Sequence, residues 1–206
     1  MLTNTYQNPY LPTPMHVLHA YYESTDRTLK TLELSFDNPQ DSAAFFRKFN
    51  PGQFCQLSVF GKGESPIGVA SAAWEGDFVR FTVQKMGAVT KALHKLQPGD
   101  PLGMRGPLGN GFPLEAWKGK NLVIIGGGCA FSTLYALTKH VQHPQNRPDF
   151  GQIIVIYGAR SSGLCMYKHD IQSWYKREDM EVHQAIDIPE EDWTHHVGYV
   201  HDVVKQ

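Results

Sequence analysis

A glycine triplet is the segment of this sequence best suited to holding a ligand. Gly126-Gly127-Gly128-Cys129-Ala130-Phe131 stands between a continuous apolar run, residues 121–125, and a stretch with helical spacing, residues 132–141. Glycine lets a backbone turn sharply and approach a ligand closely, and the N-terminus of a helix suits a pyrophosphate. Phe131 stands where the dinucleotide fingerprint has its third glycine. The segment therefore predicts either a nucleotide loop or a plain strand-to-helix turn.

A second segment of this kind follows the next apolar run. Residues 153–157 lead into Tyr157-Gly158-Ala159-Arg160. In open α/β sheets, ligands bind beyond the carboxyl ends of the strands. An arginine in this place can stack on adenine or pair with a 2′-phosphate. Taken alone it is an ordinary surface arginine, but two such strand ends in succession favour a nucleotide ligand.

A third candidate lies earlier in the chain, in Gly87-Ala88-Val89-Thr90. It separates an apparent strand that ends at Lys85 from an expected helix over residues 91–96. Thr90 is a natural N-cap for that helix. A glycine followed by a hydroxyl at a helix start is also a possible anion site, so capping and phosphate binding both remain open.

Other reactive side chains carry less weight. His195, His196 and His201 could bind a metal, but neighbouring histidines in a polar loop are mostly solvated. Cys129 could be a reactive thiol at a helix N-terminus, and a small buried apolar residue is the alternative. The acidic residues show no catalytic spacing, so we name no catalytic residue and no metal ligand.

The elements that position these segments change character along the chain. Pro9, Pro12 and Pro14 predict an extended arm over residues 1–14, neither a helix nor a central strand. Short apolar runs with turn signals between them predict a small antiparallel barrel over residues 15–114. From residue 115, apolar runs alternate with helical stretches, which predicts right-handed βαβ units and a parallel sheet over residues 115–206. The runs that we read as strands of the barrel are residues 15–22, 29–36, 53–60, 67–73, 77–85 and 101–105.

Composition excludes several classes of protein. The chain has 206 residues, 41% of them hydrophobic and 19% charged, with a net charge of −1, which is an ordinary globular balance without a nucleic-acid footprint. No apolar run approaches the ~18 residues of a membrane span, and the first residues lack the pattern of a signal peptide. Three cysteines form neither a disulfide framework nor a cluster motif. These features predict a cytoplasmic protein.

Taken together, the motifs resemble the ferredoxin–NADP reductase superfamily, and the resemblance covers nearly the whole chain. The general pattern is Gly-x-x-Thr, then Gly-Pro-x-Gly-x-Gly-Phe, strand-Gly-Gly-Gly and Tyr-Gly-Ala-Arg. The stretches Asn8–Pro12, Pro51–Gly61 and Arg105–Pro113 are similar to one branch. That branch contains the gamma subunits of NiFe (sulf)hydrogenases, the corresponding subunit of anaerobic sulfite reductase and the electron-transfer subunit of dihydroorotate dehydrogenase.

The resemblance implies two sets of binding residues. Ser65 stands where the family has an arginine on the flavin pyrophosphate, Ile67 where a tyrosine stacks on the flavin, and Gly68 where a serine reaches its N5. Gly128, Cys129 and Ala130 also depart from the usual nucleotide loop. The positions matching FAD contacts are Ser65, Pro66, Ile67, Gly68, Val69, Ser71, Val83, Gln84, Gly87, Val89 and Thr90. Those matching NAD(P) contacts are Gly126, Gly127, Gly128, Cys129, Ala130, Phe131, Tyr157, Gly158, Ala159, Arg160 and Asp187.

The same resemblance implies a fold and a function. The expected fold is a Greek-key flavin barrel joined to an incomplete α/β nucleotide domain. The expected function is transfer of hydride and electrons between NAD(P)H and FAD, and onward to iron–sulfur partner subunits of a hetero-oligomeric oxidoreductase. A non-enzymatic subunit that docks partners or senses flavin or nucleotide is the alternative. The family usually continues past Val200 with a cysteine-rich tail that holds a [2Fe–2S] cluster, whereas this chain ends at Gln206.

Overall fold

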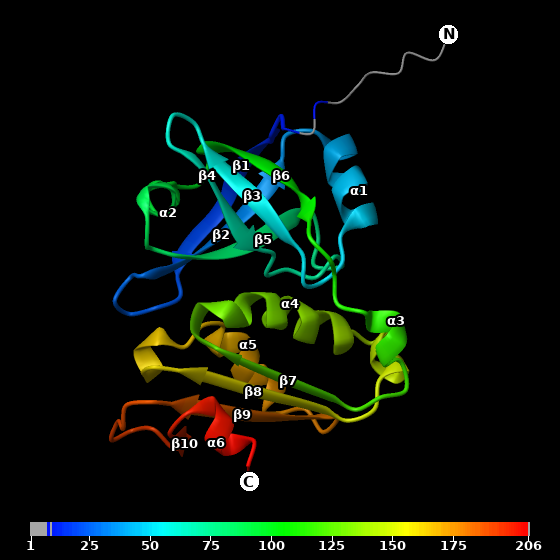
Figure 1. Ribbon diagram of the computed structural model, residues 1–206, viewed down its shortest axis with the longest axis vertical. Helices are drawn as coiled ribbons and strands as arrows, with labels where there is room; N and C mark the ends of the chain where they lie inside the picture. The colour runs from blue at the N-terminus through cyan, green and yellow to red at the C-terminus, as the bar shows by residue number, and fades with distance from the viewer. Residues whose placement is uncertain (1–7, 9, 206) are drawn as a thin grey trace.

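The computed structural model describes residue 8 and residues 10–205, and it contains two layers stacked along the long axis (Figure 1). Pro9 and residues 1–7 of the expected arm lie outside the described residues. The first layer consists of β1 (Thr13–Tyr22), β2 (Leu29–Phe36), α1 (Pro39–Lys48), β3 (Phe54–Val59), β4 (Gly63–Gly68), β5 (Phe78–Gln84), α2 (Ala88–Leu93) and β6 (Pro101–Leu108). The second consists of α3 (Leu114–Trp117), β7 (Leu122–Gly127), α4 (Phe131–Val141), β8 (Ile153–Ala159), α5 (Lys168–Trp174), β9 (Met180–Ile186), β10 (His196–Val197) and α6 (Val200–Val203), with 3₁₀ turns η1 (Gly128–Ala130), η2 (Arg147–Asp149) and η3 (Ser162–Leu164).

The first layer is one curved antiparallel sheet in the order β4-β3-β6-β1-β2-β5. Its two edges approach each other just after β4, where Val69 forms an isolated bridge with Phe81 of β5 and the Ala70 N–H donates to the Arg80 carbonyl at 2.8 Å. Val79, Phe81 and Val83 alternate along β5 and are completely buried. Such alternation is what a strand with one face on a core requires, and it confirms the period-two interpretation of this segment.

The second layer is a parallel sheet in the order β10-β9-β8-β7. The helix α4 lies between this sheet and the first layer, and α6 covers the opposite face (Figure 1). Parallel strands buried on both faces read as continuous apolar runs, and the central strand β8 has this pattern, with six of its seven residues buried. The run of β7 is also apolar, although its alternate residues Val123 and Ile125 are exposed. The antiparallel sheet followed by a parallel sheet with helices confirms the two-part fold class.

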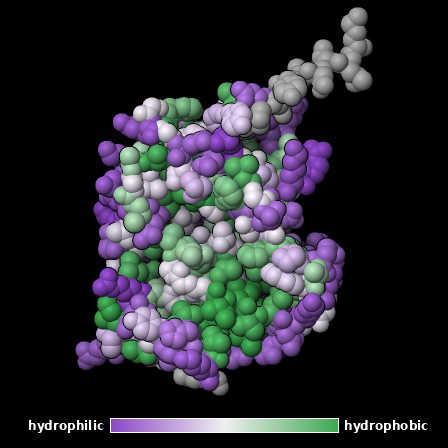
Figure 2. Space-filling view, viewed as in Figure 1, coloured by the Kyte–Doolittle hydropathy of each residue, from purple (hydrophilic) through white to green (hydrophobic). Residues whose placement is uncertain are grey.

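The outer strand β7 of the parallel sheet exposes apolar side chains. Val123 and Ile125 of β7 are 56% and 41% exposed. Figure 2 shows a large hydrophobic patch in the lower half of the molecule, where Figure 1 draws the parallel sheet. Among the described residues, β7 pairs with β8 and with no other strand. The same part of the chain has no helix that combines the length and the apolar character of a membrane span.

Several boundaries differ from the sequence prediction. The strand expected over residues 67–73 is β4, residues 63–68, because Gly61 and Gly63 adopt positive φ angles of 72° and 101° and turn the chain earlier. The helix expected over residues 91–96 begins at Ala88. Helix α1 was not predicted, although Asn38 caps it by accepting from the Gln40 N–H at 2.9 Å and Pro39 follows at the first helical position.

The expected arm is shorter than predicted. Thr13 and Pro14 belong to β1, where they pair with Met104 and Gly103 of β6. Pairing of β1 with β2 begins only at Met15. Pro14 therefore lies beyond the segment that has a neighbour on both sides, and its missing N–H removes no bond to β2. Proline is excluded from the part of a strand that has neighbours on both sides. Because of this offset in register, Pro14 lies outside that part.

Candidate functional site

The carboxyl ends of three parallel strands lie side by side, as the sequence predicted. Gly126 and Gly127 of β7 are paired with Tyr157 and Gly158 of β8. After β9 ends, the backbone N–H of Asp187 donates to the carbonyl of Ala159 at 3.1 Å. The glycine loop, the Tyr-Gly-Ala-Arg segment and Asp187 thus form one continuous edge of the sheet.

The glycine loop leads straight into α4 through the 3₁₀ turn η1. A Cβ atom on Gly126 would meet the Leu134 side chain at 2.5 Å, so this glycine lets α4 pack closely on β7. Gly128 has a positive φ of 53°, and a Cβ on it would meet no described heavy atom within 4 Å. The first turn of α4 contains no acidic residue. The loop therefore presents open space and the positive end of a helix dipole, both suited to an anion.

The other candidate nucleotide residues differ in exposure. Phe131 and Tyr157 are buried and stack on each other with ring centroids 4.2 Å apart. The Tyr157 hydroxyl accepts from the Met166 N–H at 3.0 Å, and burial raises the pKa of this phenol. These two buried rings therefore support the glycine loop from the core. Arg160 and Asp187 are exposed, so they are the charged side chains available at this edge.

Cys129 faces the first layer. Its thiol lies 3.7 Å from the carbonyl oxygen of Thr82 in β5 and donates to it, and burial raises the pKa of the thiol. A thiol with a raised pKa carries little thiolate at neutral pH and is a poor nucleophile. The structure thus favours the packing interpretation of Cys129 over the reactive one. The contact also puts the glycine loop directly against the strand that carries candidate flavin residues.

The candidate flavin residues fall into two groups. Those on the surface lie on β4, at the end of β5 and on α2; a Cβ on Gly63 would lie 3.6 Å from Val89, so β4 and α2 adjoin. Ser65, Pro66, Ile67, Gly68, Gln84, Gly87, Val89 and Thr90 are exposed or half-buried. Val69, Ser71 and Val83 are completely buried. The Ser71 hydroxyl accepts from the Arg80 N–H at 3.0 Å. The side chains of this buried group therefore stabilise the antiparallel sheet.

Thr90 caps the start of α2, but from a different position than the predicted N-cap. Gly87 is the N-cap of α2 and Thr90 is its third residue. The Thr90 hydroxyl accepts from the backbone N–H groups of Met86 and Gly87, both at 2.9 Å, and donates to the Gly87 carbonyl at 3.2 Å. These bonds satisfy backbone groups that a helix start leaves open. Simple capping, which was one of the two interpretations, accounts for its contacts.

Gly68 is explained by the packing of the two layers. A Cβ on Gly68 would collide with Cγ2 of Thr133 in α4. The end of β4 and the start of α4 therefore touch at a point where a side chain on residue 68 would require Thr133 to move. This contact gives a physical reason for a glycine at the position where the family resemblance expects a serine.

The histidines near the carboxyl end pack with aromatic rings. His195 stacks on Tyr175 with centroids 5.0 Å apart and contacts the edge of Trp193. His201 stacks on Tyr199 at 5.5 Å. Within the described residues, no group of three or more histidines, cysteines or acids could hold a metal ion.

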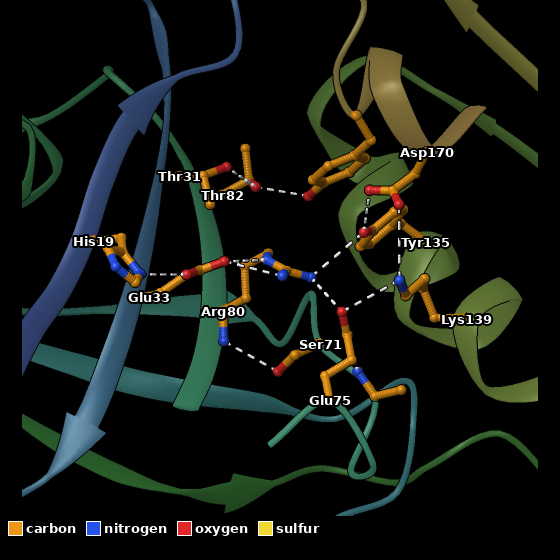
Figure 3. Close-up of polar contacts among 12 residues, drawn as sticks. His19, Thr31, Glu33, Ser71, Glu75, Arg80, Thr82, Tyr135, Lys139 and Asp170 are labelled. Carbon is orange, nitrogen blue, oxygen red and sulfur yellow. Dashed lines mark hydrogen bonds and ion pairs between the residues drawn. The ribbon is translucent and has the colours of Figure 1, made fainter. Parts of the chain in front are cut away.

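Sequence reasoning missed a polar cluster between the layers, shown in Figure 3. Arg80 of β5 contacts Glu33 of β2 at 2.9 Å and Glu75, in the loop before β5, also at 2.9 Å. It also lies 3.4 Å from the hydroxyl of Tyr135 in α4. The alternation along β5 correctly puts Arg80 outside the first core, but only the arrival of α4 buries it.

A comparison with family models matches residues 124–206 to the oxidoreductase NAD-binding domain. The chain is 36% identical over 182 residues to sulfhydrogenase 1 subunit gamma of Pyrococcus furiosus, which covers 87% of this chain and 60% of that protein. It is 38% identical over 135 residues to a probable electron-transfer subunit of dihydroorotate dehydrogenase B (NAD(+)) of Thermococcus kodakarensis, covering 64% of this chain and 52% of that protein. The chain thus spans between half and two thirds of the length of these relatives.

Solved structures show the same fold. A ferredoxin–NADP+ reductase of Neisseria gonorrhoeae with bound FAD and NADP superposes with a TM-score of 0.76 at 18% identity, over 94% of this chain and 75% of that one. The ferredoxin–NADP+ reductase of Plasmodium falciparum with 2′P-AMP gives a TM-score of 0.74 at 14% identity, over 94% and 78%. At such identities the likeness concerns the fold.

Proposed function

We propose that the chain is a member of the ferredoxin–NADP reductase superfamily and an electron-transfer subunit that moves hydride and electrons between NAD(P)H and FAD. The match to the NAD-binding domain, the two relatives and the shared fold support this proposal. One observation carries the proposal. The glycine loop of the parallel sheet lies against β5, with the Cys129 thiol 3.7 Å from the Thr82 carbonyl. A nucleotide on that loop and a flavin on the β4–β5–α2 surface would therefore meet at the seam between the layers.

The nicotinamide nucleotide would be held by the edge formed by β7, β8 and β9. Gly127 and Gly128 leave the backbone accessible, and the start of α4 offers a positive dipole end to the pyrophosphate. Arg160 would reach the adenosine half, either by stacking or by pairing with a 2′-phosphate. We favour NADP slightly over NAD because Arg160 is exposed and Lys168, the first residue of α5, is a second exposed cation that follows β8.

The flavin would be held by Ser65, Pro66 and Ile67 of β4, by Gln84, and by the start of α2. The surface fits such a group because a Cβ on Gly87 would meet no described atom within 4 Å. When bound, FAD accepts a hydride and releases electrons singly or in pairs. The protein's part is to bind and orient it. Gly68 supplies only its backbone, and Thr90 acts by keeping Gly87 and Val89 in place.

We also infer a domain division and partners. The first layer is proposed to be a Greek-key flavin barrel that begins at Thr13, two residues earlier than expected, and ends at residue 114; the bridge between Val69 and Phe81 supports this. Residues 115–206 would form the nucleotide domain, and the arm would be the residues before β1. The relatives are subunits by name, which supports a hetero-oligomeric oxidoreductase with iron–sulfur partners. A [2Fe–2S] cluster needs about four cysteines and this chain has three, so a cluster would lie outside residues 1–206.

The proposal is tested by the flavin and its reduction. The purified chain, alone or with its partners, should show flavin absorbance or a thermal shift with FAD, and NADH or NADPH should bleach it without oxygen. The variant Gly87→Asp adds a carboxylate at the N-cap of α2. It should keep or raise the stability of the helix while repelling the flavin pyrophosphate, so FAD affinity should fall. Gln40→Glu adds a carboxylate to the first turn of α1 and serves as the control.

A second function is supported by the contacts of Thr90 and Gly68. The Thr90 hydroxyl is occupied by backbone groups and the space beside Gly68 is filled by α4. A subunit that docks partners or senses flavin or nucleotide could keep the fold with these changes. A flavin-loaded protein that neither nucleotide bleaches would contradict the oxidoreductase proposal and favour this second function.

A further inference from the structure

The polar cluster between the layers joins five separate segments of the chain. Beyond the Arg80 contacts, the Tyr135 hydroxyl donates to Asp170 of α5 at 2.7 Å. Lys139 of α4 lies 3.4 Å from Glu75 and 3.8 Å from Asp170. The residues come from β2, the loop before β5, β5 itself, α4 and α5 (Figure 3). We call this set, Glu33, Glu75, Arg80, Tyr135, Lys139 and Asp170, the interlayer cluster.

The interlayer cluster is largely shielded from water. The side chains of Arg80 and Glu33 are each 11% exposed, that of Glu75 is 7% exposed and that of Lys139 is 15% exposed. Burial alone would lower the pKa of Arg80, but Tyr135 and Glu75 outweigh it and raise that pKa. The guanidinium is therefore charged and has its partners close by. Removing one member of such a buried pair leaves the opposite charge unpaired.

A second set of bonds lies beside the cluster on the same two layers. The hydroxyl groups of Thr82 and Tyr167 are 2.6 Å apart, and the Tyr167 N–H donates to Glu23 at 2.9 Å. The rings of Tyr135 and Tyr167 stack with centroids 3.8 Å apart. The seam between the layers is thus built from directed polar contacts and stacked rings, which define one relative orientation more sharply than apolar packing alone.

The interlayer cluster lies on the same strand and the same helix as the candidate site. Arg80 lies two residues before Thr82, whose carbonyl meets the Cys129 thiol. Tyr135 and Lys139 lie one and two turns along α4 from Phe131, where the glycine loop ends. The same strand and the same helix therefore carry the cluster and both faces of the proposed contact between flavin and nucleotide.

We propose that Arg80 is a positioning residue that holds α4 against β5 and so sets the distance between the glycine loop and the flavin strand. The role in hydride transfer rests on the function proposed above, whereas the role in holding the layers does not. Arg80 touches neither proposed ligand surface. Its loss should loosen the orientation of the layers and leave each layer folded.

Thiol labelling tests the structural half of this proposal without any cofactor. The chain is treated with a disulfide reagent, and mass spectrometry identifies the modified cysteine. In Arg80→Met, Cys129 should react at least about tenfold faster than in the wild type, while the buried Cys55 and Cys165 keep their rates. Arg147→Met removes an arginine that pairs with Asp179 inside the second layer and should leave the Cys129 rate unchanged.

Two further variants keep the test decisive. Tyr135→Phe retains the stacked ring and removes only the hydroxyl, so it should fold even if Arg80→Met does not, and it should still raise the Cys129 rate. Arg80→Lys keeps the charge and should restore part of the protection. A Cys129 rate that equals the wild type in every folded variant would overturn the proposal.

The kinetic half uses the flavin-loaded protein under single turnover without oxygen. Arg80→Met should lower the rate of flavin bleaching at saturating nucleotide by about tenfold or more, with nucleotide affinity within twofold of the wild type. A variant that loses affinity and keeps the rate would contradict a positioning role. If the wild type is not bleached at all, the proposed function fails, and the labelling result still decides whether Arg80 holds the layers.

Discussion

Two charged side chains at the ends of β8 and β9, Arg160 and Asp187, are the ones that we propose set the nucleotide preference of the candidate edge. Arg160 is exposed there, and its carbonyl accepts from the Ile188 N–H at 3.1 Å, which fixes its backbone beside the end of β9. Asp187 lies next to Ala159 on the same edge. A cation and an acid in these places could recognise, respectively, a 2′-phosphate and a ribose hydroxyl.

Replacing Arg160 with alanine separates these possibilities. A bidentate contact with a phosphate contributes roughly 1.5–3 kcal/mol, so Arg160→Ala should weaken NADPH binding by about tenfold to a hundredfold and NADH binding much less. Titration calorimetry with both nucleotides measures this. Lys120→Ala removes an exposed cation at the opposite end of β7 and should change neither affinity. Equal losses for both nucleotides would instead identify Arg160 as a residue that stacks on adenine.

His94 should make the stability of the first layer depend on pH. Its ring is buried, Nε2 donates to the Val83 carbonyl at 2.8 Å, and burial lowers the pKa below the ordinary value of 6.5. Below about pH 6.5 the unfolded chain binds a proton that folded His94 does not. The contribution of neutral, buried His94 to stability is therefore fully present above that pH. The free energy of unfolding should fall as the pH decreases below it.

The measurement is a urea titration between pH 8 and pH 5. His94→Gln keeps an N–H that can donate to Val83 and cannot titrate, so its stability should fall less steeply across this range. The wild type contains other histidines, and the comparison of the two slopes removes their common contribution. Identical slopes would show that His94 takes up its proton equally in the folded chain.

At the scale of elements, turns and caps determine where the candidate surfaces lie. Gly61 and Gly63 set the register of the β3–β4 hairpin, with Val59 opposite Gly63, and this brings Ser65 to Ile67 onto the half-exposed part of β4. Helix α2 begins at Ala88, after its N-cap Gly87, because Thr90 satisfies the backbone ahead of it. These local features place the flavin residues before any cofactor is present.

Thr90→Ala should therefore destabilise the protein even without FAD. Loss of the hydroxyl leaves the N–H groups of Met86 and Gly87 without this partner, and a lost cap costs about 1 kcal/mol of unfolding free energy. Denaturant unfolding of the cofactor-free chain gives the value. Thr90→Ser retains the hydroxyl and should stay close to the wild type. A Thr90→Ala chain that is as stable as the wild type, but binds FAD more weakly, would return the hydroxyl to a role in phosphate binding.

At the scale of the whole molecule, the start of the chain is the part with least reason to pack on its own barrel. Tyr10 and Leu11 are 78% and 73% exposed, whereas Pro12 packs so closely on Gly103 that a Cβ there would meet it at 2.7 Å. Among the described residues, close packing of this segment on the barrel therefore begins at Pro12. An exposed apolar end of this kind suits contact with a partner subunit.

Deleting residues 1–11 should weaken association with the native partners and leave the thermal unfolding temperature nearly unchanged, because β1 stays intact. Co-purification from the source cells measures the first quantity and calorimetry the second. A chain of full length with serine at positions 10 and 11 tests whether the two apolar side chains account for the effect. Retention of every partner by the deletion variant would exclude the arm as the docking segment.

The sequence by itself determined most of the strands, with α1 among the helices it missed, and the segments that could bind ligands. Alternation along β5 and the continuous apolar runs of β7 and β8 are local signals, because the period of burial is written in consecutive residues. The juxtaposition of the glycine loop and Arg160 also followed from the sequence, since parallel strands that succeed one another bring their carboxyl ends to one edge. Asp187 was indicated by the family resemblance, and the structure places it at the same edge.

Only the tertiary structure decided how the two layers meet. The sequence marked Gly68 as a departure from the family pattern without a reason for it, and it did not single out Arg80. The contact of Gly68 with Thr133 and the ion pairs of Arg80 are visible only in the structure. Both depend on the approach of α4, which lies more than fifty residues further along the chain. A local pattern records which face of an element is apolar, but it carries no information on which distant element covers the other face. The seam of the molecule, where the proposed chemistry would occur, is therefore fixed by packing and by the buried charges that join the layers.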